Sequence, residues 1–350
     1  MQKLRLCFMM HSLLADSGWE YSSLATGRED LEMLLSVCGR LGCKFVKAKD
    51  YFSHQSRCVC LTFDDGYLDN WTLLHPIMER RRIPYTVFVS REFVDPSETV
   101  RPFGSRQPGY LSIGELRRMH ESGLADIQSH SVTHTWYPIA PRVVDTFDAG
   151  KKAQYPWLLW NEEPSEKVRW LQLAYERFAG MPVFEHERSL KARRFLFDLD
   201  MLAHFQRRVA SRRLSVAQAN QLLEAEYRYI GRHEGQREQQ CRYTHEIAAN
   251  ADFIEASLGY RPSVLCWPGG AYDSVSQEIA YQYHPVTTIK QGYGQDEKYL
   301  HRMSATNPYG LHRFPWKHRK LTLLYYISRY ALKSRLSLRS FKGRYTSRIN

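Results

Sequence analysis

The sequence predicts an α/β fold in which parallel β-strands form a sheet or a barrel. Three observations support this class. Short apolar segments alternate regularly with amphipathic ones along the chain. The apolar run over residues 58–63 is continuous, as expected for a strand that is buried on both faces. Acidic and histidine residues directly follow two of the apolar segments, where α/β folds concentrate their chemistry.

The order of the elements follows from their patterns and stop signals. Gly42 ends the first helix and Pro84 marks the exit from the second, because these residues terminate helices. Ser112 and Glu115 form a capping-box pattern at the start of the third helix. Strands are expected at residues 4–10, 45–46, 58–63, 85–89, 125–129 and 263–267, and helices at 28–41, 70–82, 112–123 and 245–258.

The middle of the chain has a different character. Residues 135–240 are rich in Arg, Glu, Trp and Leu at helical spacing, which predicts a helical insertion. Two amphipathic helices are expected inside it, at 194–213 and 216–232. The predicted parts are a barrel of residues 1–134 and 241–316, the insertion at 135–240 and a C-terminal helix within 317–350.

Aromatic residues gather at the start of the insertion. Their rings can stack on sugar faces as part of a lid over the strand ends, or they can form a core. The near-helical spacing favours packing, and one ring can do both. The residues are Trp136, Tyr155, Trp157, Trp160 and Trp170.

The net charge of +12 belongs to the C-terminal region. No acidic residue follows Glu297, whereas 13 Lys and Arg lie within residues 298–350. The first 297 residues have a net charge of −1, and they contain no known nucleic-acid module. The charge distribution therefore disfavours nucleic acid as a partner, and the basicity of the C-terminal region requires a local explanation.

Residues 317–342 predict a basic amphipathic helix. Lys320, Arg329 and Lys333 lie on the face opposite the apolar positions. Such helices bind anionic membrane surfaces, so we expect residues 317–350 to do so. The alternative is a helix that packs on the barrel. The apolar positions are Leu321, Leu324, Tyr325, Ser328, Ala331, Leu332 and Leu336.

The cysteine spacing and the N-terminal apolar stretch indicate the cellular compartment of the protein. The seven cysteines form no CxxC pair and no regular framework, which favours a reducing environment. The first apolar stretch ends at His11 and lacks a signal-peptide pattern. No apolar run reaches the roughly 18 residues of a membrane span. We expect a cytoplasmic protein, peripheral at the inner membrane face if its C-terminal helix binds lipid.

The most specific pattern joins Asp64-Asp65 after one strand to His130-x-x-x-His134 after another. Histidines four apart share one face of a helical turn, so both imidazoles can reach one ion. Two imidazoles and one carboxylate suit Zn²⁺, and also Co²⁺ or Ni²⁺, with positions left for water. The other carboxylate remains as a base. The pattern therefore predicts a mononuclear metal hydrolase.

These residues resemble the polysaccharide deacetylase (NodB-homology, carbohydrate esterase 4) family. Residues 62–67, Thr-Phe-Asp-Asp-Gly-Tyr, match its first motif, and residues 129–134, Ser-His-Ser-Val-Thr-His, match its second. The resemblance covers residues 4–134 and 242–305. It implies a distorted (β/α)7 barrel that hydrolyses the N-acetyl group of an amino sugar. The implied catalytic base is Asp64, and the implied metal ligands are Asp65, His130 and His134.

The third motif departs from the family pattern Arg-x-Pro-Tyr/Trp-Gly, whose Arg orients the base. Residues 266–272, Cys-Trp-Pro-Gly-Gly-Ala-Tyr, take its place, with Cys266 where Arg is expected. We expect this segment to form a wall of the pocket, with Trp267 or Tyr272 contacting the sugar or its acetyl methyl. No segment matches the family's Asp-x-x-Asp-Trp motif.

The identity of the catalytic acid is left open by the sequence, because the family's usual Leu-x-His motif is not clearly present. His11 ends the first strand and resembles the N-terminal Tyr-His of the branch that acts on poly-N-acetylglucosamine. We expect His11 to be the acid, with structural capping of the strand as the alternative. His301 and His312 are rival candidates near the end of the barrel.

Together these features predict a metal-dependent enzyme that removes the N-acetyl group of an amino sugar. The substrate is a glycan or a lipid-linked saccharide, and the setting is the synthesis of cell-surface polysaccharide. The altered third motif and the missing fourth motif motivate one alternative, a catalytically inactive deacetylase-like protein that binds glycan. The complete set of metal and base residues argues against it, because binding alone does not require them.

Overall fold

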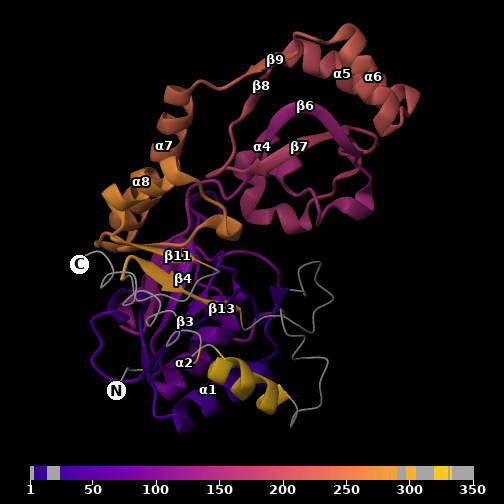
Figure 1. Cartoon of the computed structure of the whole chain (residues 1–350). Helices are drawn as coiled ribbons and strands as arrows, with labels where there is room; N and C mark the ends of the chain where they lie inside the picture. The colour runs from indigo at the N-terminus through magenta and orange to yellow at the C-terminus, as the bar shows by residue number, and fades with distance from the viewer. Residues whose placement is uncertain (1–3, 14–23, 290–296, 305–318, 330–331, 333–350) are drawn as a thin grey trace, which may run out of the picture.

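The computed structural model describes residues 4–13, 24–289, 297–304, 319–329 and 332. Its central feature is a nine-stranded parallel sheet that curls into a nearly closed barrel (Figure 1). Along the sheet the order is β12-β11-β10-β5-β4-β3-β1-β13, with β2 also paired to β3. The strands are β1 Arg5–Met10, β2 Lys44–Val46, β3 Cys58–Phe63, β4 Tyr85–Val89, β5 Ala125–Ser129, β10 Val264–Leu265, β11 Val286–Ile289, β12 Tyr299–His301 and β13 Met303–Ser304.

One short stretch of chain closes this barrel. Strand β12 pairs with β11, whereas β13 pairs with β1 at the other end of the sheet. A single residue, Arg302, separates β12 from β13. Residues 299–304 therefore change partner at Arg302 and join the two ends of the sheet. The predicted α/β barrel is confirmed.

Helices cover the outside of the barrel and bury its apolar side chains. Leu61 and Ile127 from the strands share one core cluster with Leu34 of α1 and Ile254 of α7. Each fully buried side chain of this size contributes roughly 1.5–3 kcal/mol through removal from water. Helix α3 begins with the predicted capping box at Ser112. The barrel helices include α1 Arg28–Arg40, α2 His75–Arg81, α3 Ile113–Glu121, α7 Gln236–Leu258 and α8 Ser274–Tyr283.

The insertion between β5 and α7 contains the two predicted helices, as α5 Leu199–Arg212 and α6 Val216–Glu226, but it is not helical throughout. It contains two antiparallel strand pairs, one of β6 with β7 and one of β8 with β9. Pro138 and Pro141 disfavour a helix over β6, because proline disrupts helix interiors. Figure 1 shows the insertion standing above the barrel, with α7 leading back down to it. Its elements include β6 Trp136–Thr146, α4 Trp157–Glu162, β7 Pro182–Arg188, β8 Phe195–Phe197, α5 Leu199–Arg212, α6 Val216–Glu226 and β9 Gly231–His233.

The aromatic residues of the insertion mostly form a core, as their spacing favours. Tyr155, Trp157, Trp160 and Trp170 belong to one buried cluster and are at most 5% exposed. Trp136 packs against this cluster and stays partly exposed. Within the group, Trp136 is therefore the ring that a ligand can reach.

The C-terminal helix packs on the barrel through one face. Residues 319–329 are helical and lie beside α1 (Figure 1), where Leu323 and Ile327 are buried in the main core. Leu321 and Tyr325, which the sequence assigns to the apolar face, are instead 64% and 59% exposed. The packing alternative thus holds for one face of the helix, and an apolar face remains exposed. Apart from residue 332, the later residues lie outside the described ranges.

Two further observations concern the chain as a whole. All seven cysteines are free, as their irregular spacing predicts. Among the described residues, no helix is both long enough and apolar enough to cross a membrane.

Asn250 of α7 fastens this helix to the strand ends of the barrel. Its Nδ2 donates hydrogen bonds to the carbonyl oxygen of Val89 at 3.0 Å and to Oγ of Ser129 at 2.9 Å. Its Oδ1 accepts a hydrogen bond from the backbone N–H of Arg91 at 2.8 Å. The side chain is fully buried, so an apolar replacement leaves these groups without their partner.

We expect Asn250→Leu to lower the free energy of unfolding by about 1–3 kcal/mol, because buried polar groups lose their hydrogen bonds. Urea denaturation measures this change. Gln240→Leu on the exposed side of the same helix is the matched control and should stay within about 0.5 kcal/mol of the parent. Equal effects of the two substitutions would contradict the role given to Asn250.

Candidate metal and catalytic site

The carboxyl ends of four strands of the parallel sheet supply the candidate site. His11 follows β1, Asp64 and Asp65 follow β3, His130 follows β5, and Cys266 follows β10. The strand ladders continue into these residues, since the N–H of Asp64 donates to the carbonyl of Met10 at 2.9 Å. The parallel sheet thus brings together residues that are up to 255 positions apart in the sequence.

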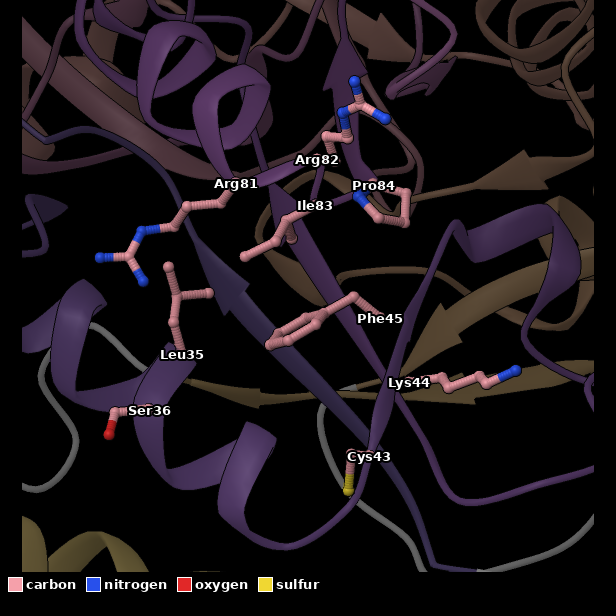
Figure 2. A pocket seen from close by; sticks show the side chains of 9 residues that line it. All are labelled: Leu35, Ser36, Cys43, Lys44, Phe45, Arg81, Arg82, Ile83 and Pro84. Carbon is pink, nitrogen blue, oxygen red and sulfur yellow. The ribbon is translucent and has the colours of Figure 1, made fainter.

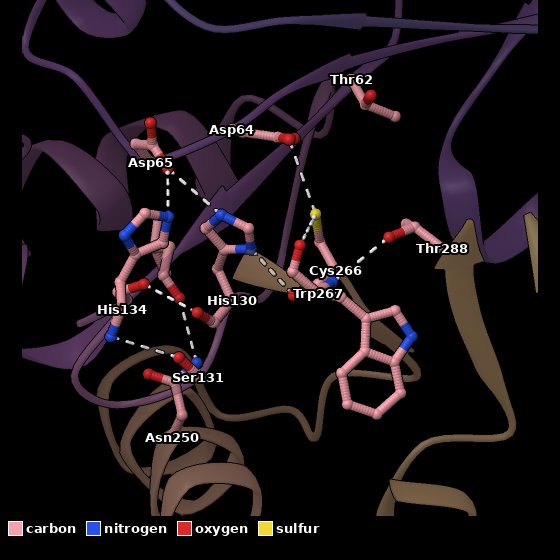
Figure 3. A network of polar contacts seen from close by, with 12 residues as sticks. Thr62, Asp64, Asp65, His130, Ser131, His134, Asn250, Cys266, Trp267 and Thr288 are labelled. Atoms are coloured by element: carbon pink, nitrogen blue, oxygen red, sulfur yellow. Dashed lines mark hydrogen bonds and ion pairs between the residues drawn. The ribbon is translucent and has the colours of Figure 1, made fainter. Parts of the chain in front are cut away.

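Asp65, His130 and His134 form a cluster that fits one metal ion (Figure 3). Oδ1 of Asp65 lies 3.1 Å from Nε2 of His130 and 3.2 Å from Nε2 of His134. Donors about 2.0–2.1 Å from a tetrahedral Zn²⁺ are roughly 3.3 Å from one another. The donor atoms therefore have both the chemistry and the spacing of a zinc-type site.

The segment from His130 to His134 is a loop, not the predicted helical turn. Ser131 and His134 have positive φ angles of 69° and 46°, which no right-handed helix allows. Glu246 of α7 holds the loop by accepting hydrogen bonds from the N–H groups of Val132 at 3.2 Å and Thr133 at 2.9 Å. The two imidazoles thus converge because the loop folds back.

The insertion also holds this loop. Nζ of Lys167 donates a hydrogen bond to the carbonyl oxygen of Thr133 at 2.8 Å and lies 2.5 Å from Oε2 of Glu92. The lysine side chain is 1% exposed. A buried ammonium group is stable only when its donors are satisfied. Lys167 therefore fixes the insertion to the loop that carries His134.

A buried arginine supports Asp64, and sequence reasoning missed it. Nη1 of Arg302 lies 2.6 Å from Oδ1 of Asp64, and both side chains are at most 5% exposed. The same guanidinium donates to Sγ of Cys266 at 2.9 Å and to Oγ1 of Thr62 at 3.2 Å. Arg302 lies in the segment that closes the barrel. It thus supplies the guanidinium that the family pattern would place at position 266. The available signal was a buried carboxylate that needed a cation.

Charges at the site keep both aspartates ionised. Burial opposes ionisation of Asp64, but Arg302 and His11 hold its pKa below the ordinary value. Burial also opposes ionisation of Asp65, but His134 and His130 hold its pKa well below the ordinary value. Carboxylates in these forms can bind a cation or accept a proton.

The histidines differ in their surroundings. Nδ1 of His130 donates to the carbonyl oxygen of Cys266 at 2.8 Å, which directs Nε2 toward Asp65. Burial lowers the pKa of His130, but Cys266 and Asp65 outweigh it and raise that pKa. Burial dominates at His134 and lowers its pKa, which favours the neutral imidazole that metals bind.

The structure separates the three candidates for the catalytic acid. His11 lies beside Asp64, since the residues that precede them, Met10 and Phe63, are register partners in strands β1 and β3. Its Nδ1 is buried and makes no hydrogen bond among the described residues. His301 is buried at the end of β12 and directly precedes Arg302. His312 lies outside the described residues.

The third-motif residues only partly match the expected substrate contacts. Trp267 is 0% exposed and packs in a core cluster with Leu190 and Tyr243, so in this structure it cannot touch a sugar. The expected contact between Trp267 and the sugar is therefore wrong, because the indole is buried beneath α8 and does not face the pocket. Tyr272 stacks on it at a ring-centroid distance of 4.9 Å and remains partly exposed.

A surface pocket of about 540 Å³ lies away from these residues (Figure 2). Lys44 begins β2, and Pro84 immediately precedes β4, so the pocket is at the amino ends of the strands. It contains none of the strand-end carboxylates or histidines. The lining residues are Leu35, Ser36, Cys43, Lys44, Phe45, Arg81, Arg82, Ile83 and Pro84.

Comparisons with known proteins agree with the fold and the motifs. Residues 53–154 match the model of the polysaccharide deacetylase family. The deacetylase domain of BpsB from Bordetella bronchiseptica is 16% identical with a TM-score of 0.54, over 86% of this chain and 95% of that one. A de-N-acetylase from Aggregatibacter actinomycetemcomitans is 14% identical with a TM-score of 0.55, over 89% and 97%. No curated protein gives a significant sequence match.

The fold and the matched motifs define a deacetylase barrel of the NodB type, and residues 53–154 carry the match to the polysaccharide deacetylase family. The protein is accordingly a hydrolase of amide bonds, within the carbohydrate esterase 4 class. The family reaction is the N-deacetylation of a polysaccharide.

The ion pair between Arg302 and Asp64 can be tested by a double-mutant cycle. We expect Arg302→Met to lower the free energy of unfolding by about 3–5 kcal/mol, because it leaves a buried carboxylate uncompensated. Asp64→Asn should remove much of that penalty in the double variant, giving a coupling energy of about 1–3 kcal/mol. Urea denaturation of the metal-free protein provides the four values.

Arg261→Met is the matched control, because Arg261 pairs with Asp252 at 2.9 Å on the exposed surface. Its effect should stay within about 1 kcal/mol. A coupling energy near zero between Arg302 and Asp64 would show that the two groups do not depend on each other.

Proposed function

We propose that this protein is a metal-dependent deacetylase that hydrolyses the N-acetyl group of an amino sugar. Its substrate is a glycan or a lipid-linked saccharide used in the synthesis of cell-surface polysaccharide. The observation that carries the proposal is the joint geometry of two carboxylates. Asp65 faces His130 and His134 as a metal ligand would, while the adjacent Asp64 faces Arg302 and remains available as a base.

The metal-binding residues would be Asp65, His130 and His134. A bound cation supplies an acidified water and polarises the acetyl carbonyl. Two imidazoles and one carboxylate suit Zn²⁺ best, and Co²⁺ or Ni²⁺ fits the same donors. The neutral form favoured at His134 agrees with this donor set.

Asp64 accepts the proton of the attacking water in the proposed mechanism. Arg302 contacts only one of its oxygens closely, at 2.6 Å to Oδ1, while Oδ2 has a weak contact with Sγ of Cys266 at 3.5 Å. The guanidinium therefore orients the carboxylate and keeps it ionised. His11 donates a proton to the departing amine as general acid.

The alternative of a glycan-binding protein without activity loses its main support. That alternative rested on Cys266 in place of the arginine that orients the base, and on the missing fourth motif. Arg302 meets Asp64 from another strand, so the base has its cationic partner after all. A protein that only binds glycan requires neither this ion pair nor the metal cluster.

We further propose that the enzyme works in the cytoplasm, at the inner face of the membrane. Leu321 and Tyr325 form an exposed apolar face on the helix of residues 319–329, and exposed Leu332 follows. Residues 333–350 add six basic side chains and no acidic one. Apolar contacts joined to positive charge suit an anionic lipid surface, at about 1 kcal/mol per basic residue.

The roles of the two aspartates predict different losses. Asp64→Asn should lower acetate release by about 10²–10⁴-fold while the protein keeps its metal, because it removes a general base. Asp65→Asn should lose the metal itself. Acetate release from chito-oligosaccharides with added Zn²⁺ or Co²⁺, together with elemental analysis of the dialysed protein, separates the two effects.

Asp200→Asn, on an exposed position of α5, is the matched control and should change neither quantity. Near-full activity of Asp64→Asn would remove Asp64 from the mechanism. Wild-type protein that holds metal but releases no acetate from any N-acetylated glycan would instead favour the binding protein. Mass spectrometry of surface glycans from cells with and without the active enzyme would identify the natural sugar.

Membrane association predicts co-sedimentation with phosphatidylglycerol vesicles at low salt, and little with phosphatidylcholine vesicles. Removing residues 333–350 should abolish most of this binding, and Leu321→Gln with Tyr325→Gln should weaken it further. A truncation at residue 317 is unsuitable, because Leu323 and Ile327 belong to the core. Tighter binding to duplex DNA than to anionic vesicles would contradict the proposal.

A further inference from the structure

Arg188, the last residue of β7, brings a positive charge from the insertion to the edge of the site. Its guanidinium carbon lies 4.6 Å from the ring centroid of Trp136. The Trp136 ring lies 6.1 Å from that of His134. Together these two distances place the guanidinium within about 11 Å of a proposed metal ligand. The span is short enough for a sugar residue to reach both.

The third-motif segment makes room for this side chain. A Cβ added at Gly269 would lie 1.5 Å from Nη1 of Arg188, so the guanidinium rests directly on the glycine backbone. Gly269 also has a positive φ of 57°, which glycine adopts readily. Insertion and barrel thus meet at Arg188, beside the segment that begins with Cys266.

The guanidinium of Arg188 makes no direct contact with a carboxylate among the described residues. It makes no hydrogen bond and no ion pair there. Glu187, its neighbour, pairs with Lys191 at 2.8 Å, and Asp65 is directed to its two histidines.

Burial normally requires such a charge to be paired. Burial lowers the pKa of Arg188, while the charge of Asp65 acts in the opposite direction. Arg188 is itself only partly buried, whereas the partly buried Arg242 meets Glu234 at 2.5 Å and the buried Arg302 meets Asp64 at 2.6 Å. Arg188 therefore retains an unused planar donor group at the entrance to the site.

We propose that Arg188 binds an oxyanion carried by the substrate, next to the N-acetyl group that is hydrolysed. The substrate class is then an anionic N-acetylated sugar, bearing either a carboxylate or a phosphate. A guanidinium binds both through paired N–H donors. The partly exposed ring of Trp136 lies beside it and offers a face for the sugar. This inference rests on the proposed deacetylase function and adds the charge of the substrate to it.

Binding to the full-length Asp64→Asn variant tests the inference without requiring turnover. Calorimetric titration would use N-acetylglucosamine 1-phosphate, N-acetylmuramic acid and neutral N-acetylglucosamine, all with Zn²⁺ present. Adding Arg188→Gln should weaken binding of at least one anionic sugar by about 10–100-fold, because a charge-assisted contact is lost. Neutral sugar should change by less than about twofold. The anionic sugar that responds identifies the group that Arg188 binds.

Two further variants make the result specific. Arg188→Lys keeps the charge but loses the paired donors, so its loss should be smaller and again confined to the anionic sugar. Arg142→Gln removes an exposed arginine of the same insertion, paired to Glu185 at 2.9 Å, and should have no effect. Thermal unfolding confirms that each variant is folded.

The outcomes separate this inference from the proposed function. Binding of an anionic sugar that depends on Arg188, without acetate release by the wild type, would support the anion site and overturn the hydrolysis. Equal losses for neutral and anionic sugars, or no loss for either, would overturn the anion site. Absence of binding by every sugar would overturn it as well.

Discussion

The buried ion pair between Arg302 and Asp64 is the interaction on which the site depends. Two charges are removed from water there, and their desolvation is offset only by close geometry and by added hydrogen bonds. Arg302 meets these conditions by contacting Asp64, Thr62 and Cys266 together. The strand ends can therefore hold an ionised carboxylate in a place that would otherwise favour its protonated form. Every step assigned to Asp64 requires that state.

The insertion is part of this site and not only a cover above it. Lys167 reaches the carbonyl of Thr133 inside the loop that carries the histidines. Arg188 reaches the glycine turn on the other side. Both side chains extend from the insertion, whose aromatic core also includes Tyr67, Phe93 and Tyr110 of the barrel. A rigid body thus presents two cations at fixed positions, which suits recognition of a defined substrate.

The sequence predicts those features that local patterns determine. Continuous apolar runs revealed the central strands, and Asp64-Asp65 with His130 and His134 revealed the candidate metal site. The loop conformation at Ser131 was missed, because a histidine spacing of four is equally compatible with a helical turn and with a folded loop. The strands of the insertion were missed because a partly exposed hairpin lacks strict alternation. Arg302 was missed because its partner is distant in sequence, and only the closed barrel brings the two together.

The closing strand has a consequence for the order of events during synthesis. Strand β1 gains its second neighbouring strand only when residues 303–304 pair with it. This pairing joins segments that lie at opposite ends of the barrel in the sequence. Contacts between such distant segments form late in folding. Arg302 lies within that last segment, so a growing chain holds the Asp64 carboxylate before it holds the countercharge. The carboxylate of Asp64 thus gains its countercharge in the same event that seals the barrel.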